Sequence, residues 1–401
     1  MSRRAISTRR AHAMMTAAFF LLGATTATWA ARIPAVVAKL HLSPGSLGLA
    51  LLGPAVGAIV AIPATGAALA SVAPRRIVQA GYVVVAGLLP VISLTDSTWQ
   101  LFTVLAGWGV GLGMIDVGIN TEASEIQSRL GQRVMSRFHA GYSVGGLTGA
   151  GLGAAAAASG IPIREHFLIA ASIVLIGGVF AAESFAGGPP PLVKNRTPPR
   201  ARRPQWSWTL VALAAMALGS FLAEGASVDW SAVYLHSALG APVGLAALTY
   251  TVFAAAMAFV RLVGDRLTNR LGPVRLVRVS AGLAACSFAA ALVVGRVWAG
   301  LLGFAALGAG LAFIVPLVFT ASSQLGRTGP NLAFVTSCGY AGMLAGPGLI
   351  GGLAEVIGLP GALGVIVACA ALAAALAGVV APRTISPPTT PESDRLHAGS
   401  E

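Results

Sequence analysis

Charged residues are scarce in this 401-residue chain, where they make up 10% of the sequence. An ordinary soluble domain has about 25% charged residues. Hydrophobic residues make up 56%, and the mean hydropathy is +0.80. Such a chain has too few polar groups to cover a solvated surface and too many apolar ones to stay disordered. The composition therefore excludes a soluble enzyme of one or two domains and indicates a membrane protein.

Cysteine and lysine are also rare. The three cysteines lie inside apolar runs without disulfide or metal-site spacing, so they are interpreted as small packing residues. The two lysines, Lys39 and Lys194, follow Ala38 and Val193, whereas a phosphate-binding P-loop needs a Gly-Lys pair. The zinc motif His-Glu-x-x-His is missing too. The sequence therefore predicts no ATPase, no metal site, no cofactor and no enzymatic activity.

Long apolar runs, in contrast, are abundant. A membrane-spanning helix needs about 20 mostly apolar residues. Apolar runs of this length are expected to be helices, because lipid cannot pair the free backbone groups of an exposed sheet edge. Twelve such runs are expected, and Pro, Gly or a charge marks most of the joints between them. They lie near residues 13–33, 46–70, 76–95, 99–120, 137–158, 164–185, 207–231, 242–263, 274–295, 297–320, 331–354 and 357–380.

These runs divide the chain into two groups of six. The expected parts are a basic tail (1–12), an N-terminal six-helix bundle (13–185), a Pro- and Arg-rich linker (186–206), a C-terminal six-helix bundle (207–381) and a disordered tail (382–401). With both termini on one side, that side holds 22 of the 26 basic residues. Basic residues favour the cytoplasmic side of a membrane. The +13 net charge therefore indicates topology rather than nucleic-acid binding, with both termini in the cytoplasm and the chain in the plasma (inner) membrane.

The two groups of six share a weak internal repeat. Gly141-Tyr142 recurs as Gly339-Tyr340 at an offset of 198 residues. Two glycine pairs in the fourth and tenth runs match at 197, and the stretches that begin at 73 and 272 match at 199. Parallel six-helix halves around a central cavity are an architecture of secondary transporters. The expected fold is thus an all-α membrane protein with twelve transmembrane helices in two pseudo-repeat bundles.

The loops after the second and eighth runs carry a family resemblance. The first spans Gly66 to Arg76, and the second reads Asp265-Arg266-Leu-Thr-Asn269-Arg270-Leu-Gly272-Pro-Val-Arg275. Both resemble the Gly-x-x-x-Asp-Arg-x-Gly-x-Arg-Arg loop of the major facilitator superfamily, whose loops pair charges across the cytoplasmic face and act in gating. The first copy keeps a glycine and the terminal arginine pair but lacks the acid. The resemblance implies gating roles here, and the alternative is that the basic residues simply anchor the loops in the cytoplasm; the residues concerned are Arg75, Arg76, Asp265, Arg266 and Arg270.

Few charges fall at membrane depth, where each one is costly and therefore a functional candidate. Asp116 lies in the fourth run, and Asn120 lies four residues later on the same helix face. The stretch 111–120 resembles the fucose–proton symporter branch of the superfamily, whose acid there takes part in coupling or sugar binding. The resemblance implies those roles for Asp116 and Asn120, although that branch's second acid would fall at Ala30. The alternative is an Asp capped by nearby polar groups.

The seventh run carries Glu224 and Asp229. Five residues on a regular helix turn by about 140°, so these acids share a face only if the helix bends at Gly225. Asp229 is repeat-equivalent to Ala30 and is a candidate for the missing acid, or it is simply solvated near the outer interface. Arg32 is a candidate partner of Asp229 in an outer gate, and the alternative is an arginine that snorkels to the interface.

Further candidates lie near the fifth run. Residues 122–137 are expected to form a cytoplasmic amphipathic segment, mostly solvated loop. His139 is a possible proton relay or a packed interhelical histidine, while Tyr142 and Trp230 are possible cavity residues or core. The stretch 136–139 resembles a little-characterised bacterial branch of the superfamily that also carries Glu-Gly and Asp-Trp pairs in its seventh span.

Taken together, these patterns predict a monomeric secondary transporter whose partners are a small-molecule solute, protons and the lipid bilayer, with no nucleic acid. Proton-coupled symport of a small polar solute such as a sugar is the first hypothesis, because Asp116 and Asn120 offer a polar site. Proton-linked efflux of a drug or metabolite is the second, since the remaining runs are apolar. A non-transporting membrane sensor or scaffold is the alternative from another class.

Overall fold

The computed structural model of the chain describes residues 2–130, 134–185, 206–325 and 328–381. Every regular element in these described ranges is a helix. The first half contains α1 (Ser2–Ala30), α2 (Ile33–Leu40), α3 (Pro44–Leu51), α4 (Gly53–Ala68), α5 (Pro74–Ile92), α6 (Thr98–Leu130), α7 (Met135–Ala158) and α8 (Ile163–Ala182). The second half contains α9 (Trp208–Val233), α10 (Val243–Leu262), α11 (Gly264–Leu271), α12 (Pro273–Val294), α13 (Val297–Leu311), α14 (Ile314–Ser323) and α15 (Thr328–Ala375).

Within the described part of the chain, ten helical stretches are long and apolar enough to cross a membrane. They correspond closely to the expected runs, with two differences. The run expected at 137–158 is α7, whose many glycines and polar side chains keep it outside the ten. The runs expected at 331–354 and 357–380 share α15, which is broken at Gly358, where a φ of 75° interrupts the helical backbone.

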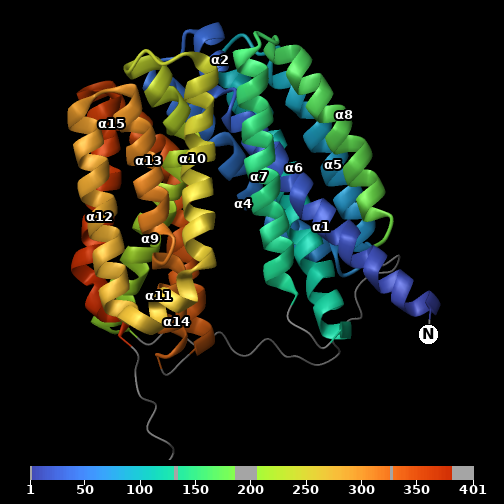
Figure 1. Cartoon of the computed structure of the whole chain (residues 1–401). Coiled ribbons are helices and arrows are strands. Elements are labelled where there is room, and N and C mark those ends of the chain that lie inside the picture. The colour runs from blue at the N-terminus through green and yellow to red at the C-terminus, as the bar shows by residue number, and fades with distance from the viewer. Residues whose placement is uncertain (1, 131–133, 186–205, 326–327, 382–401) are drawn as a thin grey trace, which may run out of the picture.

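The helices of the two halves gather side by side, the first half in blue to green and the second in yellow-green to red (Figure 1). Within the first half, α1 packs on α7 and α8, and α6 packs on α4 and α5. Within the second half, α9 packs on α15, and α12 packs on α13. The halves meet along two seams, one between α3 and α15 and one between α7 and α10.

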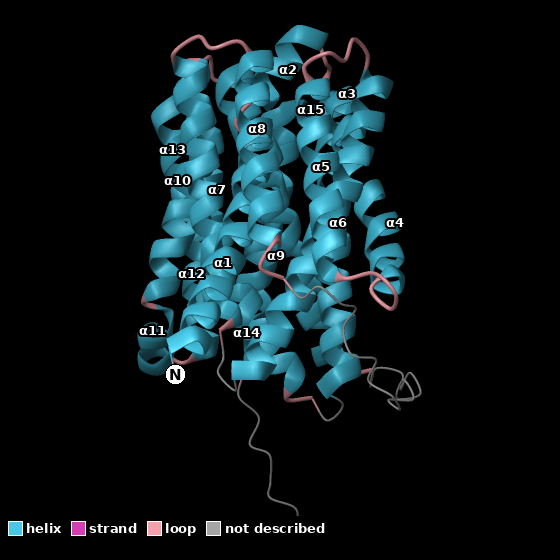
Figure 2. Cartoon of the chain, turned by 90° about the vertical axis from the view of Figure 1, so that its right-hand side faces the viewer, coloured by secondary structure: helices cyan, strands magenta, loops and turns pink. Residues whose placement is uncertain are grey.

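The two ends of the helices form two different faces of the molecule. The linker face holds the start of α1, the end of α8 and the start of α9, and the opposite face, called the distal face below, holds α2 and the start of α3 (Figures 1 and 2). Exposed tryptophans occur near both faces, as is typical of side chains at the two borders of a bilayer. They are Trp99 and Trp298 at the distal face and Trp206 and Trp208 at the linker face.

Glycine allows the closest helix contacts inside each half. A Cβ atom at Gly145 of α7 would overlap the carbonyl oxygen of Phe20 on α1. A Cβ atom at Gly342 of α15 would likewise overlap the carbonyl oxygen of Leu218 on α9. These two glycines are 197 residues apart, within the offsets of the sequence repeat. Small residues that let backbones approach are the usual means of helix packing in membranes.

Two segments of the first half differ from expectation. The expected tail 1–12 is helical from Ser2 onward, since α1 begins there. The segment expected to be mostly loop at 122–137 continues α6 as helix through Leu130. Its Glu122 and Ala123 are buried, 5% and 0% exposed, so the start of this stretch packs against the protein. The expected linker, apart from its last residue, and the tail from 382 lie outside the described residues.

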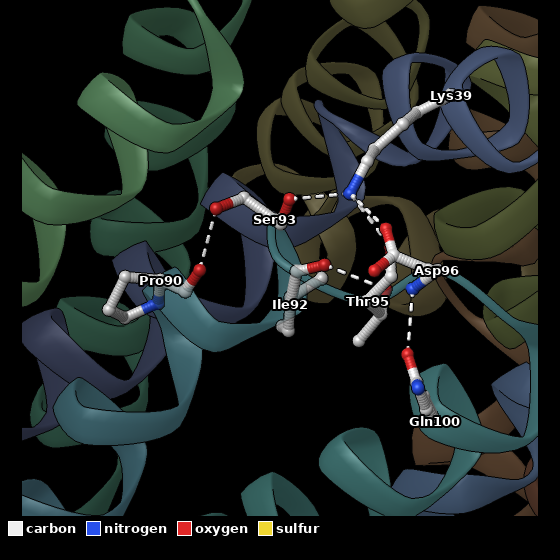
Figure 3. Close-up of polar contacts among 7 residues, drawn as sticks. All are labelled: Lys39, Pro90, Ile92, Ser93, Thr95, Asp96 and Gln100. Carbon is white, nitrogen blue, oxygen red and sulfur yellow. Dashed lines mark hydrogen bonds and ion pairs between the residues drawn. The ribbon is translucent and has the colours of Figure 1, made fainter.

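A polar corner ties α2 to the turn between α5 and α6 on the distal face (Figure 3). The Nζ atom of Lys39 donates to the carbonyl oxygens of Ser93 and Thr95, at 2.9 and 2.7 Å, and lies 3.3 Å from the carboxylate of Asp96. Gln100 accepts from the backbone N–H of Asp96 at 2.8 Å. Lys39 thus satisfies the free carbonyls at the end of α5, which explains a basic residue on this face.

Candidate transport site

Asp116 and Asn120 lie on the same face of α6, as their spacing predicts. The side-chain amide of Asn120 donates to the carboxylate of Asp116 at 3.0 Å and to its backbone carbonyl at 2.8 Å. Asp116 is nevertheless exposed in the protein alone. One oxygen of the carboxylate is therefore held in place by Asn120 while the side chain remains open to a solute or proton.

Residues of two other helices approach the same carboxylate. Asp116 interacts electrostatically with the imidazole of His139 on α7. The phenol groups of Tyr142 on α7 and Tyr340 on α15 also interact electrostatically with Asp116. Because α15 belongs to the second half, Asp116 faces the interior between the two halves and not the lipid.

The second half contributes an acid of its own to this group. Glu224 on α9 interacts electrostatically with Arg261 on α10. Tyr250 on α10 lies within the electrostatic reach of Glu224, Asp229 and Arg261. Both acids lie within one continuous helix, α9, which runs from Trp208 to Val233. The two acids of α9 share Tyr250 as a neighbour although they do not share one helix face.

Tyr142 connects the two acidic positions. Its phenol lies near both Asp116 of the first half and Glu224 of the second half, and it makes a side-chain hydrogen bond with Thr26 of α1. The Tyr142 side chain is 38% exposed, so it is accessible from the space between the halves. The group consisting of Asp116, Asn120, His139, Tyr142, Glu224, Tyr250, Arg261 and Tyr340 is called the inter-half polar group below.

Arg32 does not form the expected outer gate with Asp229. Its guanidinium donates instead to the carbonyl oxygen of Ile161, in the turn between α7 and α8, at 2.7 Å. Its side chain is 5% exposed, so it does not snorkel to the interface either. A buried arginine near His166 binds the distal ends of α1 and α8 together, which is a role within the first half.

Trp230 was expected to be either a cavity residue or a core residue, and the structure places it in the protein core. It is fully buried and lines an apolar pocket together with residues such as Val37, Leu47 and Leu359. This pocket adjoins the distal ends of α2, α3 and α15. Trp230 is therefore placed between the halves, in an apolar pocket near the distal face.

The loop arginines show a contact within one half. Arg75 forms an ion pair with Glu183 at the end of α8, and Gln79 donates to the same carboxylate at 2.9 Å. This pairing fixes α5 to α8 inside the first half and does not cross to the second half. Arg76, Arg266 and Arg270 are exposed, and the side chain of Asp265 lies outside the described residues.

Two members of the polar group, Tyr250 and Arg261, were not singled out by the sequence. Arg261 counted only as one basic residue near the linker face. The two residues are eleven positions apart, which is three helical turns and places them on one face of α10. This spacing of a tyrosine and an arginine on an otherwise apolar helix could have identified them as candidates from the sequence. Within the described residues, no group of three or more metal-ligating side chains occurs.

The sequence comparisons agree with this architecture. Residues 14–330 match the model of the Major Facilitator Superfamily. The chain is 35% identical over 381 residues to the uncharacterized transporter y4wD of Sinorhizobium fredii, covering 91% of this chain and 96% of that protein. It is 33% identical over 348 residues to an uncharacterized MFS-type transporter of Yersinia pestis, covering 85% and 88% of the two chains.

Solved structures show the same fold at low sequence identity. A D-xylose–proton symporter superposes with a TM-score of 0.72 at 13% identity and covers 93% of this chain and 98% of its own. A bacterial homolog of the human lysosomal transporter Spinster, in an inward-facing and occupied conformation, gives 0.72 at 15% identity, covering 95% and 97%. The nucleoside transporter NupG gives 0.69 at 16% identity, covering 92% and 98%. The chain therefore belongs to the major facilitator superfamily and is a membrane-spanning transporter.

Proposed function

We propose that this transporter moves a small polar solute, such as a sugar, together with protons by alternating access of its two halves. The observation that carries the proposal is the position of Tyr142, which neighbours a carboxyl of each half, Asp116 and Glu224. A carboxyl at membrane depth that is exposed in turn to the two sides of the membrane can take up and release a proton. Hydroxyl and amide groups around it offer hydrogen bonds to a polar solute.

The proposed topology has twelve crossings. It counts α7 as a span and counts α15 as two spans separated by the break at Gly358. The linker face is proposed to be cytoplasmic, because it holds most of the basic residues, and both termini lie on that side. The protein is proposed to act as a monomer in the plasma (inner) membrane, with the solute, protons and lipid as its partners.

The solute class is supported by the composition of the inter-half polar group. Three tyrosines and one asparagine supply neutral hydrogen-bonding groups, whereas Arg261 is the group's only permanent cation. The structural neighbours named above include transporters of a sugar and of nucleosides, both of them hydroxyl-rich solutes. A neutral or weakly charged solute with several hydroxyl groups suits this set of side chains better than a large apolar compound.

The test uses the full chain in liposomes that enclose a pH-sensitive dye. Sugars, polyols, nucleosides and cationic drugs are added outside one at a time. Proton symport predicts that one solute class acidifies the liposome lumen, and that Asp116→Asn lowers the rate of acidification at least tenfold. The matched control is Asp96→Asn, the same chemical change on the distal face, which should keep the wild-type rate because Asp96 only pairs with Lys39.

Each other outcome points to a different function. Lumen alkalinisation with a drug would indicate proton-linked efflux instead of symport. A symport signal that survives Asp116→Asn would move the proton site to Glu224 or Asp229. Absence of any solute-dependent proton movement in wild-type protein across the panel would contradict proton symport and favour a non-transporting role.

A further inference from the structure

A single glutamate joins the two halves at the distal face. Glu355 lies on α15 of the second half, and Ser43 and Gly45 lie at the start of α3 in the first half, more than 300 residues away. The backbone N–H of Gly45 donates to the Oε1 atom of Glu355 at 3.0 Å. The Ser43 hydroxyl donates to the same oxygen. One carboxylate oxygen therefore receives two hydrogen bonds from the other half of the molecule.

The start of α3 is well suited to hold a carboxylate. Ser43 is the N-cap residue of this eight-residue helix, and its hydroxyl oxygen accepts from the N–H of Ser46 at 3.2 Å. The first N–H groups of a helix have no partner within the helix, and the helix dipole adds a partial positive charge there. Glu355 thus completes the cap of α3 from the opposite half, with hydrogen bonds to a charged acceptor.

Close backbone contact below the carboxylate shows that the two helices are fully together. A Cβ atom at Gly48 of α3 would lie 2.7 Å from the carbonyl oxygen of Pro347 and 2.9 Å from the Cα atom of Gly351. A Cβ atom at Gly45 would lie 2.7 Å from the Cγ atom of Glu355. The distal end of this seam is therefore closed, with no room for an additional methyl group.

We propose that Glu355 is a latch that holds the distal face closed, and that it must leave the start of α3 before that face opens. The proposal rests on the alternating access proposed above. Opening the distal face separates α3 from α15, because these helices belong to different halves. Both hydrogen bonds to Glu355 then break together, whereas contacts inside each half remain. The latch favours the state that is open to the linker face.

The proposal is tested by measuring distances across the halves, without any solute. The three native cysteines are replaced by serine, and spin-label pairs are placed on exposed positions of the full chain in lipid nanodiscs. Leu94 and Val356 report on the distal face, and Ser71 and Leu271 report on the linker face. In the parent protein the distal pair should show mainly one short distance.

Glu355→Ala should increase the long-distance population of the distal pair about three- to tenfold, since it removes a charge at a helix N-terminus and two hydrogen bonds. Glu355→Gln should give a smaller increase, because the amide oxygen still accepts a hydrogen bond. The matched control is Glu165→Gln, the same change on an exposed acid of the distal end of α8, which should leave both label pairs unchanged.

A second variant tests the latch while keeping α3 capped. Aspartate is as good an N-cap as serine, so Ser43→Asp preserves the helix start but places a negative charge against Glu355. It should open the distal face more than Glu355→Gln does. Combining Ser43→Asp with Glu355→Gln should restore part of the parent distance distribution, because the repulsion is gone.

Unchanged distal distances in both Glu355→Ala and Ser43→Asp would overturn the latch, whatever the transport results. Equal and independent effects of Ser43→Asp in the presence and absence of Glu355 would overturn it too. A distance change in variants of a protein that moves no solute in the liposome assay would support the latch and contradict the proposed solute transport. The two proposals therefore fail separately.

Discussion

The two seams between the halves are related by the internal repeat but are built differently. At the α3–α15 seam, Gly48 meets Gly351, and a carboxylate crosses between the halves. At the α7–α10 seam, the residue 199 positions after Gly48 is Ala247, which is buried against Ala154 and Ala31. At these matched positions the first seam thus combines a close glycine contact with a polar link, whereas the second has an apolar alanine contact.

The polar groups near the second seam make the difference clearer. Gly244 is the counterpart of Gly45 at an offset of 199, and it packs on the methyl group of Ala158 instead of on a glutamate. Arg32, which is buried near Ala31, donates to the carbonyl of Ile161, and this contact stays within the first half. At the matched positions 45/244 and 48/247, only the α3–α15 seam has a polar contact between the halves; elsewhere on the α7–α10 seam, Tyr142 and Tyr250 interact electrostatically across it. Alanine contacts slide more easily than a directional hydrogen bond breaks, so the second seam is suited to act as a pivot.

The largest expected effect comes from filling the Gly48 contact. Gly48→Val should force α3 away from α15, because its side chain meets backbone atoms that cannot move aside. Overpacking of this kind costs about 1–3 kcal/mol. Since about 1.4 kcal/mol is a tenfold change, the distal-open population of the Leu94–Val356 label pair should rise roughly five- to hundredfold.

Ala247→Val is the matched change at the other seam. That position already accommodates a Cβ atom, so its effect on the same label pair should be clearly smaller. Equal shifts from Gly48→Val and Ala247→Val would show that the two seams tolerate added volume alike, and the comparison between them would not hold.

An intermediate effect is expected for alanine at the two repeat-related glycines, Gly45 and Gly244. The nearest atoms to a Cβ at Gly45 belong to the flexible side chain of Glu355, whereas those at Gly244 belong to Ala158, including its backbone. Gly45→Ala should therefore open the distal face several-fold in the parent protein and have almost no effect in a Glu355→Ala background, a coupling of about 1 kcal/mol. Gly244→Ala should behave the same in both backgrounds.

This coupling is read from the same distal label pair in a double-variant cycle. Additive effects of Gly45→Ala and Glu355→Ala would mean that Gly45 contacts something other than the glutamate. A strong dependence of Gly244→Ala on Glu355 would mean that the two seams move as one, and would remove the distinction between latch and pivot.

The smallest effect on the seams is expected for Arg32. Arg32→Ala removes a buried side chain and its hydrogen bond to Ile161, so it should lower the stability of the protein by about 2–4 kcal/mol. Because that contact lies inside the first half, the label distances across the halves should stay as in the parent. Thermal unfolding followed by intrinsic fluorescence checks the first expectation, and the spin labels check the second. A change in the distal distance would place Arg32 in the gate after all.

Much of the helix layout was predictable from apolar length. The runs expected at 76–95 and 274–295 are α5 (Pro74–Ile92) and α12 (Pro273–Val294), with ends that differ by three residues or fewer. Proline at the first helical turn marks both starts. The helix at 122–130 was not predicted, because its charged residues are typical of a solvated loop. The burial of Glu122 depends on tertiary packing, which the sequence pattern does not show.

The candidate site was predictable only where its contacts are local. Asn120 lies four residues after Asp116, and helix geometry alone brings the two together. The place of Tyr250 and Arg261 beside Glu224 depends on how α10 rotates against α9, and no spacing within one helix encodes that rotation. The partner of Arg32 was not predictable for the same reason: in this structure its guanidinium donates to the carbonyl of Ile161 in the α7–α8 turn.

The sequence by itself determined that this chain is helical and lies in a membrane, because apolar length and scarcity of charge are properties of the chain alone; a repeated offset in the sequence also predicted two similar halves. It also placed Asp116 and Asn120 on one face. The tertiary structure decided which side chains from different helices meet: Tyr142 between Asp116 and Glu224, Arg32 with Ile161, and Glu355 at the start of α3. Contacts between residues hundreds of positions apart depend on how whole helices pack and rotate, and that is settled by the fit of all their faces together.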